Sequence, residues 1–317
     1  MNNNFHIFLG ATVADAAARP LHWVYNEKEL KNYIRNKKEI TFLKKNRCPF
    51  YSIKNGSVSG YNDIGQVMFR TLQAKKNKSK ILENFKKNIV KNFGPGSVYW
   101  KNLKLRKKYK NIKWKNPIKG PWIHQNILET IQNIKFKKKI TGGIKVNESD
   151  GFCASLPYFL YDSKISNVKK VIKAVANKKV SEKFAITKLQ IINLASRGDK
   201  NPVKSFLKKN KKNMYFKEVI SNIKKTINDI KKPHTQIVKK YGKACSYPGT
   251  FNGALHAILT SKNYKTAIIK TIKAGGCNCS RANFVGAYFA ALNGFNDIPH
   301  NWIKKTIPAK NILKYLT

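Results

Sequence analysis

The sequence predicts an all-α fold in a single domain spanning residues 1–317, and three features of the chain lead to this prediction. Apolar residues recur at the three- and four-residue spacing of amphipathic helices, with lysine at many of the positions between them. No stretch of any length shows the alternation of apolar and polar residues that is typical of a half-buried strand. No linker-like segment divides the chain, and its length suffices for one large core.

Helical spacing recurs along most of the chain. Phe5–Ala18 is apolar with small residues interleaved, and Pro20 ends this predicted buried helix. A Gly/Ser/Asn loop then gives way to a helical pattern at about Tyr61. Lys101–Lys119 is expected to be irregular or only partly helical. The other predicted helical stretches are 27–35, 81–93, 122–134, a short helix after the polar loop near 150, 168–176, 183–195, 219–241, a helix around His256, 264–273, 274–294 and short pieces near Trp302 and Leu313.

The stretch Ala274–Gly294, with the sequence AGGCNCSRANFVGAYFAALNG, is expected to hold the central helix. Residues such as Ala282, Gly286 and Ala290 leave little bulk on one side, so neighbouring backbones can approach closely. The segment Asn278–Ser280 stands where a helix N-cap is expected. Free N–H groups and the positive end of the helix dipole favour polar or anionic ligands at such a terminus, which makes it a candidate site.

The formal net charge of +49 would ordinarily indicate a nucleic-acid-binding protein. Of the 64 basic residues only seven are arginine, and the lysines are spread over the whole chain. Surfaces dedicated to nucleic acids favour arginine and concentrate aromatic residues on one face. The nearest candidate is Lys101–Lys115, which contains Tyr109 and Trp114 among lysines. We therefore expect no specific nucleic-acid partner.

The five cysteines include no CxxC pair, and their odd number excludes a simple disulfide framework. This usage suits a reducing compartment, so a cytoplasmic location is expected. The start MNNNFHIFLG lacks the features of a signal peptide, and no apolar run reaches about 18 residues. No membrane partner is expected either.

Three polar segments stand out at predicted helix starts: Asn62–Asp63, Ser149–Asp150 and Asn278–Ser280. Polar groups from different helices can converge on one cleft in a helical protein, and oxygen-rich sets suit Mg²⁺. Each segment also has a structural interpretation, because an acid complements the helix dipole and a first-turn polar residue caps the helix. The sequence leaves both interpretations open.

Thiols and imidazoles offer a second chemistry. Cys277 and Cys279 are expected to be small buried residues rather than zinc ligands, and His22 and His256 are expected to be core histidines, since each lies among apolar residues. A nucleophilic pair of Cys279 with His22 stays open, because spatial adjacency cannot be read from the sequence.

Four ordered motifs then resemble the ADP-ribosylglycohydrolase family, and within it the branch of J1 crystallins and selenoprotein J. They are GATVADAAARPLHWVY, SGYNDIGQVMFRTL, ACSYPGTFNGALHAIL and AGGCNCSRANFVGAYFAALNG. The resemblance covers nearly the full chain. It implies an all-α fold around a cleft with two Mg²⁺ ions, where a glycosidic bond of ADP-ribose is hydrolysed.

The family's two acidic runs fall on altered residues. Its Thr-Asp-Asp run corresponds to Asn62, Asp63 and Ile64, and its Gly-Gly-Asp-Thr-Asp-Thr run to Gly275–Ser280. Asp63 is the only carboxylate kept among the four acid positions, so the resemblance implies a depleted Mg²⁺ site. The residues expected on this basis are Asp63 and Asp150 for catalysis, Asn62, Asp63 and Ser280 for metal, and His22, Tyr61, Gly276, Asn278 and Ser280 for the ligand.

Two functions follow as alternatives. The first is hydrolysis of ADP-ribose linkages with Mg²⁺, acting on an ADP-ribose-type small molecule or an ADP-ribosylated substrate. The second is a non-catalytic member, either a binder of ADP-ribose-type ligands or a structural protein of the crystallin kind.

Overall fold

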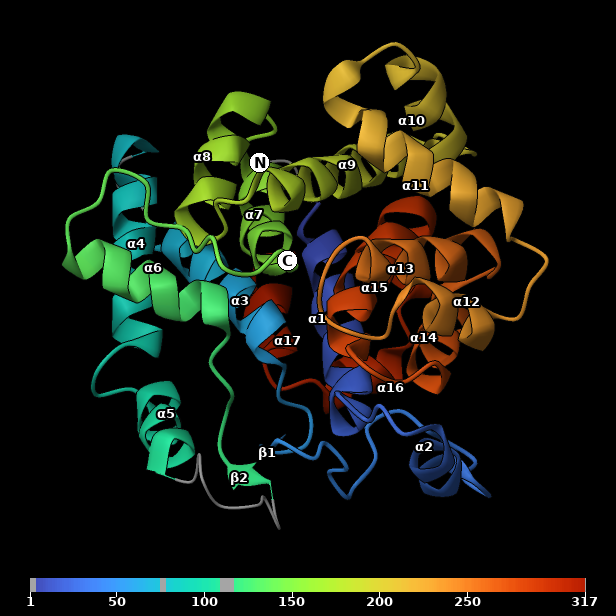
Figure 1. Ribbon diagram of the computed structural model, residues 1–317, viewed down its shortest axis with the longest axis horizontal. Helices are drawn as coiled ribbons and strands as arrows, with labels where there is room; N and C mark the ends of the chain where they lie inside the picture. Colours follow the sequence, from blue (N-terminus) through green and yellow to red (C-terminus); the bar gives the residue numbers. More distant parts are fainter. Residues whose placement is uncertain (1–3, 75–77, 109–116, 317) are drawn as a thin grey trace.

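The computed structural model describes residues 4–74, 78–108 and 117–316, and within them the chain is built almost wholly of helices (Figure 1). The first half contains α1 (Phe5–Ala18), α2 (Glu27–Ile34), α3 (Gly60–Gln73), α4 (Ile81–Phe93), α5 (Val98–Lys108), α6 (Gln125–Lys135), α7 (Asp150–Tyr161), α8 (Ile165–Val175) and α9 (Lys179–Ser196). The second half contains α10 (Pro202–Asn210), α11 (Lys217–Asn228), α12 (His234–Tyr241), α13 (Gly249–Leu259), α14 (Tyr264–Lys273), α15 (Asn278–Asn293), α16 (His300–Lys305) and α17 (Ala309–Leu313). The all-α prediction is confirmed.

Two short strands are the only sheet among the described residues. β1 (Tyr51–Ser52) pairs in parallel with β2 (Ile118–Lys119), and each strand has only two residues. Strands of this length are too short to show an alternating pattern, so they could not be predicted from the sequence.

The centre of the fold is the pair α1 and α15, which lie along each other (Figure 1). A Cβ added at Gly286 would lie 2.4 Å from the Gly10 carbonyl oxygen and 2.5 Å from the Cβ of Ala14. Such distances are far below van der Waals contact, so the two helices approach closely only because these positions are small. The expectation of a central small-residue helix is confirmed, since every residue from Asn278 to Ala291 is buried.

The structure differs from the expected helices in three details. The stretch 219–241 is two helices, because Pro233 lacks an amide hydrogen and separates α11 from α12. The N-cap of the central helix is Cys277, so Asn278, Cys279 and Ser280 form its first turn instead. The helix α10 was not predicted at all.

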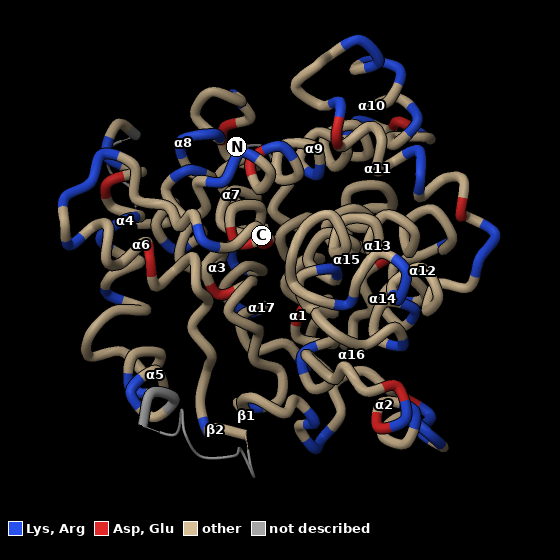
Figure 2. Tube along the Cα trace, viewed as in Figure 1, with Lys and Arg blue, Asp and Glu red and all other residues tan. Residues whose placement is uncertain are grey.

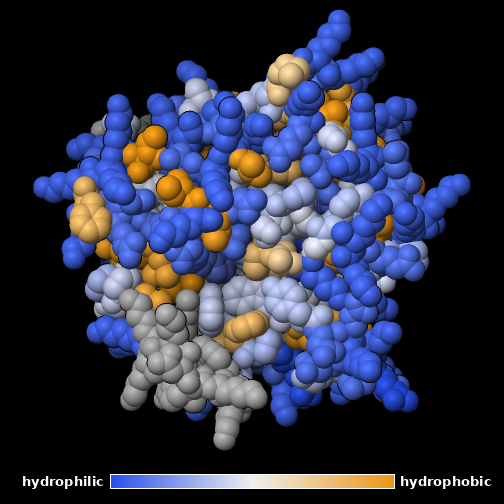
Figure 3. Space-filling view, viewed as in Figure 1, coloured by the Kyte–Doolittle hydropathy of each residue, from blue (hydrophilic) through white to orange (hydrophobic). Residues whose placement is uncertain are grey.

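Most of the lysine and arginine residues lie around the outside of the fold, whereas the central helices carry few charges (Figure 2). The face shown in Figure 3 is accordingly mostly hydrophilic, with apolar residues scattered over it. The basic segment expected as the nearest nucleic-acid candidate, Lys101–Lys115, is described only to Lys108, and the stretch containing Tyr109 and Trp114 lies outside the described residues. Among the residues that the structure covers, no helix combines the length and apolarity needed to cross a membrane.

Candidate functional site

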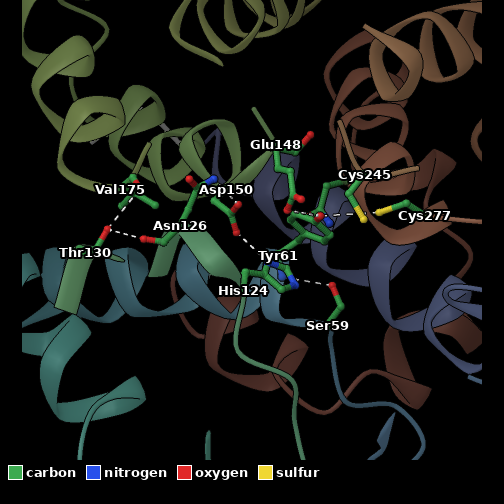
Figure 4. Close-up of polar contacts among 12 residues, drawn as sticks. Ser59, Tyr61, His124, Asn126, Thr130, Glu148, Asp150, Val175, Cys245 and Cys277 are labelled. Atoms are coloured by element: carbon green, nitrogen blue, oxygen red, sulfur yellow. Dashed lines mark hydrogen bonds and ion pairs between the residues drawn. The ribbon is translucent and has the colours of Figure 1, made fainter. Parts of the chain in front are cut away.

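Residues next to the three expected polar segments meet where α3, α7 and α15 begin. Tyr61, in the first turn of α3, donates its hydroxyl hydrogen to Glu148 Oε2 at 3.0 Å, just ahead of α7. The Tyr61 oxygen also lies 3.7 Å from Cys277 Sγ, at the start of α15. Figure 4 shows these side chains directed toward one another. The structure therefore brings together three segments that are far apart in the chain.

The expected metal residues of α3 bond to separate partners. Asp63 accepts a short hydrogen bond from the hydroxyl of Tyr99. Burial raises the pKa of Asp63, and the hydrogen bond from Tyr99 opposes this rise. Asn62 donates to Asn283 Oδ1 at 2.8 Å and accepts from Gln66. The two neighbours in sequence thus have different surroundings.

The expected ligand residues of α15 are used in structural bonds. Asn278 donates to the carbonyls of Ala18 and Leu21 at 3.3 and 3.2 Å, and Ser280 donates to the carbonyl of Cys277 at 2.9 Å. The backbone of Gly276 pairs with Trp23 and Val24 on both of its polar groups, at 2.8 Å each.

Gly276 itself has a φ of +63°, a conformation that favours glycine. These bonds hold the chain around residues 18–24 against the start of α15. No described contact joins Asn62, Asp63 and Ser280 as a ligand set.

A cluster of His124, Glu148 and Asp150 does place three potential ligand atoms within 4.8 Å of one another. His124 Nδ1 lies 2.7 Å from Asp150 Oδ1, and Asn126 donates to the other oxygen of Asp150 at 2.9 Å (Figure 4). His124 caps α6, and Asp150 opens α7. Of these three residues, only Asp150 was among the site residues predicted from the sequence. Glu148 could have been added because it is an acid two residues before Asp150, and His124 because it lies near the start of a predicted helix.

Burial and charge shift the protonation of this cluster. Burial raises the pKa of Glu148 to about 7, and the nearby charge of Asp150 adds to this rise. Burial alone would lower the pKa of His124, but the charge and hydrogen bond of Asp150 outweigh it, so the pKa is raised. The cluster therefore combines a buried His–Asp ion pair with a carboxyl group that still holds its proton near neutral pH.

Cys277 lies at the other end of the Tyr61 contact. Its sulfur is 3.6 Å from Nε2 of His22, whose Nδ1 lies 3.0 Å from the Tyr51 hydroxyl. The open alternative of a pair between His22 and Cys279 is not what the structure forms, because the Cys279 thiol points to the carbonyl of Asp15 at 3.7 Å. The cysteine that faces His22 is Cys277.

The residues of this site differ in their exposure to solvent. Tyr61, Asp150 and Cys277 are fully buried, whereas Glu148 and Cys245 are partly exposed. Four surface hollows of the described chain, among them one of about 620 Å³ lined by Tyr158 and Tyr161 and one of about 640 Å³ lined by Ile34 and Trp302, include none of these five residues. Of these five residues, Glu148 and Cys245 are the two that reach the surface.

A family model for ADP-ribosylglycohydrolase matches residues 6–315, nearly the whole chain. The chain belongs to the ADP-ribosylglycohydrolase family. Among curated relatives it is 30% identical to Crystallin J1A of Tripedalia cystophora over 320 residues, covering 97% of this chain and 92% of the relative. Crystallin J1B of the same organism is 28% identical, with the same coverage of both chains.

A solved structure described as an ADP-ribosylglycohydrolase-related protein complex superimposes with a TM-score of 0.60 over 99% of this chain and 95% of that chain. The two share 11% sequence identity, so this comparison shows the shared fold alone.

The residues at the family's acid positions do not fit two Mg²⁺ ions. Hard divalent cations prefer several carboxylate oxygens, and Ile64, Cys277 and Cys279 provide none. The fourth position, Asp63, already accepts the hydrogen bond from Tyr99. The family is metal-dependent, and the His124–Glu148–Asp150 cluster is the one group of potential metal ligands among the described His, Cys, Asp and Glu side chains.

Proposed function

We propose that this member of the ADP-ribosylglycohydrolase family hydrolyses an ADP-ribose-type glycosidic linkage, with Glu148 as the general acid. The observation that supports this most is the carboxyl group of Glu148, which is partly exposed and has its pKa raised to about 7. Cleavage of a glycosidic bond requires a proton for the leaving group, and a carboxyl group with a raised pKa can supply it near neutral pH.

The neighbours of Glu148 position this group. Tyr61 donates a hydrogen bond to its Oε2 and fixes the direction of the carboxyl group. The negative charge of Asp150 disfavours ionisation of Glu148, while His124 balances Asp150 through the 2.7 Å ion pair. Asp150, expected as catalytic from the sequence, acts in this proposal through Glu148.

The role of Mg²⁺ is also part of the proposal. If a cation binds among Asn62, Asp63 and Ser280, it must compete with the bonds these side chains make to Asn283, Tyr99 and the Cys277 carbonyl. We therefore propose that activity depends weakly on Mg²⁺ and strongly on Glu148. The substrate is an ADP-ribose-type small molecule or an ADP-ribosylated protein, and no nucleic acid or membrane is required.

The test is release of ADP-ribose from ADP-ribosylated peptides that carry serine and arginine linkages, measured with Mg²⁺ and with EDTA. The rate should fall as the pH rises through about 7, because only protonated Glu148 donates a proton. Glu148→Gln should lower kcat by roughly 100-fold or more. Glu83→Gln on the exposed face of α4 is the matched control and should leave the rate unchanged. Release that is unaffected by Glu148→Gln would exclude this mechanism.

The altered acid positions support a second candidate, a non-catalytic protein. Thiols and an apolar side chain stand where the family has carboxylates, and the curated relatives are named crystallins. Calorimetry with ADP-ribose distinguishes a non-catalytic protein that binds the ligand from one that is purely structural. Binding without release indicates a ligand-binding protein, whereas neither binding nor release on any linkage indicates a structural one.

A further inference from the structure

We propose that Cys277 and Cys245 form a second reactive centre, in which Cys277 is oxidised by a hydroperoxide and Cys245 then closes a disulfide with it. This inference goes beyond the proposed glycosidic hydrolysis, because it uses the thiols and requires no ADP-ribose ligand. Neither residue is in a disulfide, and both lie at the site described above.

The two thiols are in contact because a backbone hydrogen bond holds the segment just before Cys245 against Cys277. The amide of Cys277 donates to the carbonyl of Lys243 at 2.8 Å, which brings the segment before α13 to the start of α15. The Cys245 and Cys277 side chains then hydrogen-bond to each other (Figure 4). The indole N–H of Trp23 donates to Cys245 Sγ at 3.2 Å and fixes this thiol in place. The two thiols are therefore already neighbours in the reduced protein.

His22 is arranged to stabilise a thiolate on Cys277. Tyr51 is fully buried, and burial raises its pKa well above the usual value, so its hydroxyl keeps its proton. The hydroxyl can donate a hydrogen bond to Nδ1 of His22, 3.0 Å away, and the neutral ring then carries its own hydrogen on Nε2. Nε2 faces Cys277 Sγ at 3.6 Å. A neutral imidazole thus donates to the sulfur, as is typical of a nucleophile oriented by a histidine and a third group.

A buried cation near the two thiols also favours the thiolate form of Cys277. Arg281 is fully buried in the first part of α15, and its Nε and Nη1 have no hydrogen-bond partner in the described chain. None of the described ion pairs gives Arg281 a carboxylate. An unpaired buried charge is costly, and a thiolate on Cys277 would offset part of that cost. The helix start of α15 adds to the positive potential.

The two thiols differ in pKa, as is expected for a cysteine that attacks the peroxide and a cysteine that then closes the disulfide. Burial acts to raise the pKa of Cys277, but hydrogen bonds from Cys245 and His22 outweigh it, and the pKa is well below the usual value. The hydrogen bond to Cys277 raises the pKa of Cys245 well above the usual value, and burial adds to this. Cys245 is the partly exposed member, on the edge of the site where a small oxidant can enter.

The reaction proceeds in two balanced steps. The Cys277 thiolate attacks the terminal oxygen of a hydroperoxide, the O–O bond breaks, and the leaving oxygen takes up the proton that the thiol released on ionisation and departs as alcohol or water, which gives Cys277 sulfenic acid. The sulfur of Cys245 then displaces hydroxide from that sulfenic acid, and with the Cys245 proton this leaves as water. Two thiols are oxidised and one peroxide is reduced. A dithiol reductant returns the pair to the starting state.

The experiment treats the reduced full-length protein with one equivalent of hydrogen peroxide and follows it by intact mass and peptide mapping. We expect a loss of two hydrogens and a peptide that joins Cys245 to Cys277, reversed by dithiothreitol. Cys245→Ser should stop at sulfenic acid on Cys277, trapped by dimedone. Cys277 should be oxidised at least tenfold faster than Cys48 and Cys153, which are buried internal controls in the same sample.

Equal rates at Cys277 and the two internal controls would overturn the proposal, and so would oxidation that yields no joined peptide. Both readouts use the wild-type chain, so they hold even where a variant fails to fold. A Cys279→Ser variant is the matched control, since its thiol points to Asp15 instead of to Cys245, and it should behave as wild type. Loss of ADP-ribose release would not affect either readout.

Discussion

Replacement of Lys188 by methionine should raise stability near neutral pH. Lys188 lies on α9 with no exposed surface, and its Nζ donates to Ser149 Oγ at 3.1 Å and to the Tyr247 hydroxyl at 3.0 Å. The aromatic rings of Phe152 and Tyr247 surround it, with Nζ 4.8 and 4.7 Å from the ring centroids. None of the described ion pairs gives it a carboxylate, and burial lowers its pKa from 10.5 to about 7.

The sign of the effect follows from this depressed pKa. Between about pH 7 and 10.5 the unfolded chain binds a proton at Lys188 that the folded chain does not, so folding is disfavoured and stability rises with pH over this window. With these two pKa values the free energy of unfolding gains about 3 kcal/mol from pH 7 to pH 9.5 through this residue alone.

Lys188→Met keeps the apolar stem and removes the titration. Ser149 and Tyr247 stay bonded to each other at 3.2 Å in the structure, so neither hydroxyl is left without a partner. We expect the variant to be more stable than wild type at pH 7 by about 1–3 kcal/mol, after the loss of two hydrogen bonds of about 1 kcal/mol each is subtracted. This advantage should shrink by about 3 kcal/mol at pH 9.5.

The assay is urea denaturation of both proteins at the two pH values, with a reductant present for the five cysteines. Comparison with wild type cancels the titration of all other groups. Lys209→Met, at an exposed position of α10, is the matched control and should show no such change with pH. A difference between wild type and Lys188→Met that stays constant with pH would refute the assignment of a neutral buried amine to this position.

Two further predictions concern the packing that positions the site. Gly286→Ala should destabilise the protein by at least about 1–3 kcal/mol, because the added Cβ would meet the Gly10 carbonyl at 2.4 Å, and an unchanged urea midpoint would contradict the close approach of α1 and α15. Trp302→Ala should cost about 3–5 kcal/mol, since its side chain is 1% exposed and its indole N–H donates to Glu39 at 3.1 Å. Trp302→Phe should recover part of that loss, and equal losses in the two variants would show that ring packing contributes little.

Local patterns in the sequence predicted the scaffold well. The spacing of apolar residues and the lysines between them predicted the helices, and the small residues of Ala274–Gly294 predicted the close pairing at the centre. The polar helix starts were expected to converge on one cleft, and the residues that do make contact, Tyr61, Glu148 and Cys277, are neighbours of the expected segments. These features are local, or they depend on repeated spacing, so one sequence contains them.

The contents of the site could not be predicted in the same way. Asp63 pairs with Tyr99 across 36 positions, and nothing near either residue indicates this bond. The choice between Cys277 and Cys279 as the partner of His22 depends on where α15 begins, because Cys277 is its N-cap residue and Cys279 lies in its first turn and points to Asp15. The roles assigned to Asp63 and Asp150 from the sequence stay predictions until variants are measured.

The scaffold and the chemistry of this site depend on different residues, so they can be tested apart. Close contact of α1 with α15 fixes where the helix starts lie, and it depends on Gly10 and Gly286 rather than on any acid. An exchange of carboxylates for thiols at the start of α15 therefore leaves the fold intact while it replaces oxygen ligands by nucleophilic sulfur. Glu148→Gln should then abolish glycosidic hydrolysis and leave peroxide oxidation of Cys277 intact, whereas Cys245→Ser should stop disulfide formation and leave the proton donor Glu148 in place.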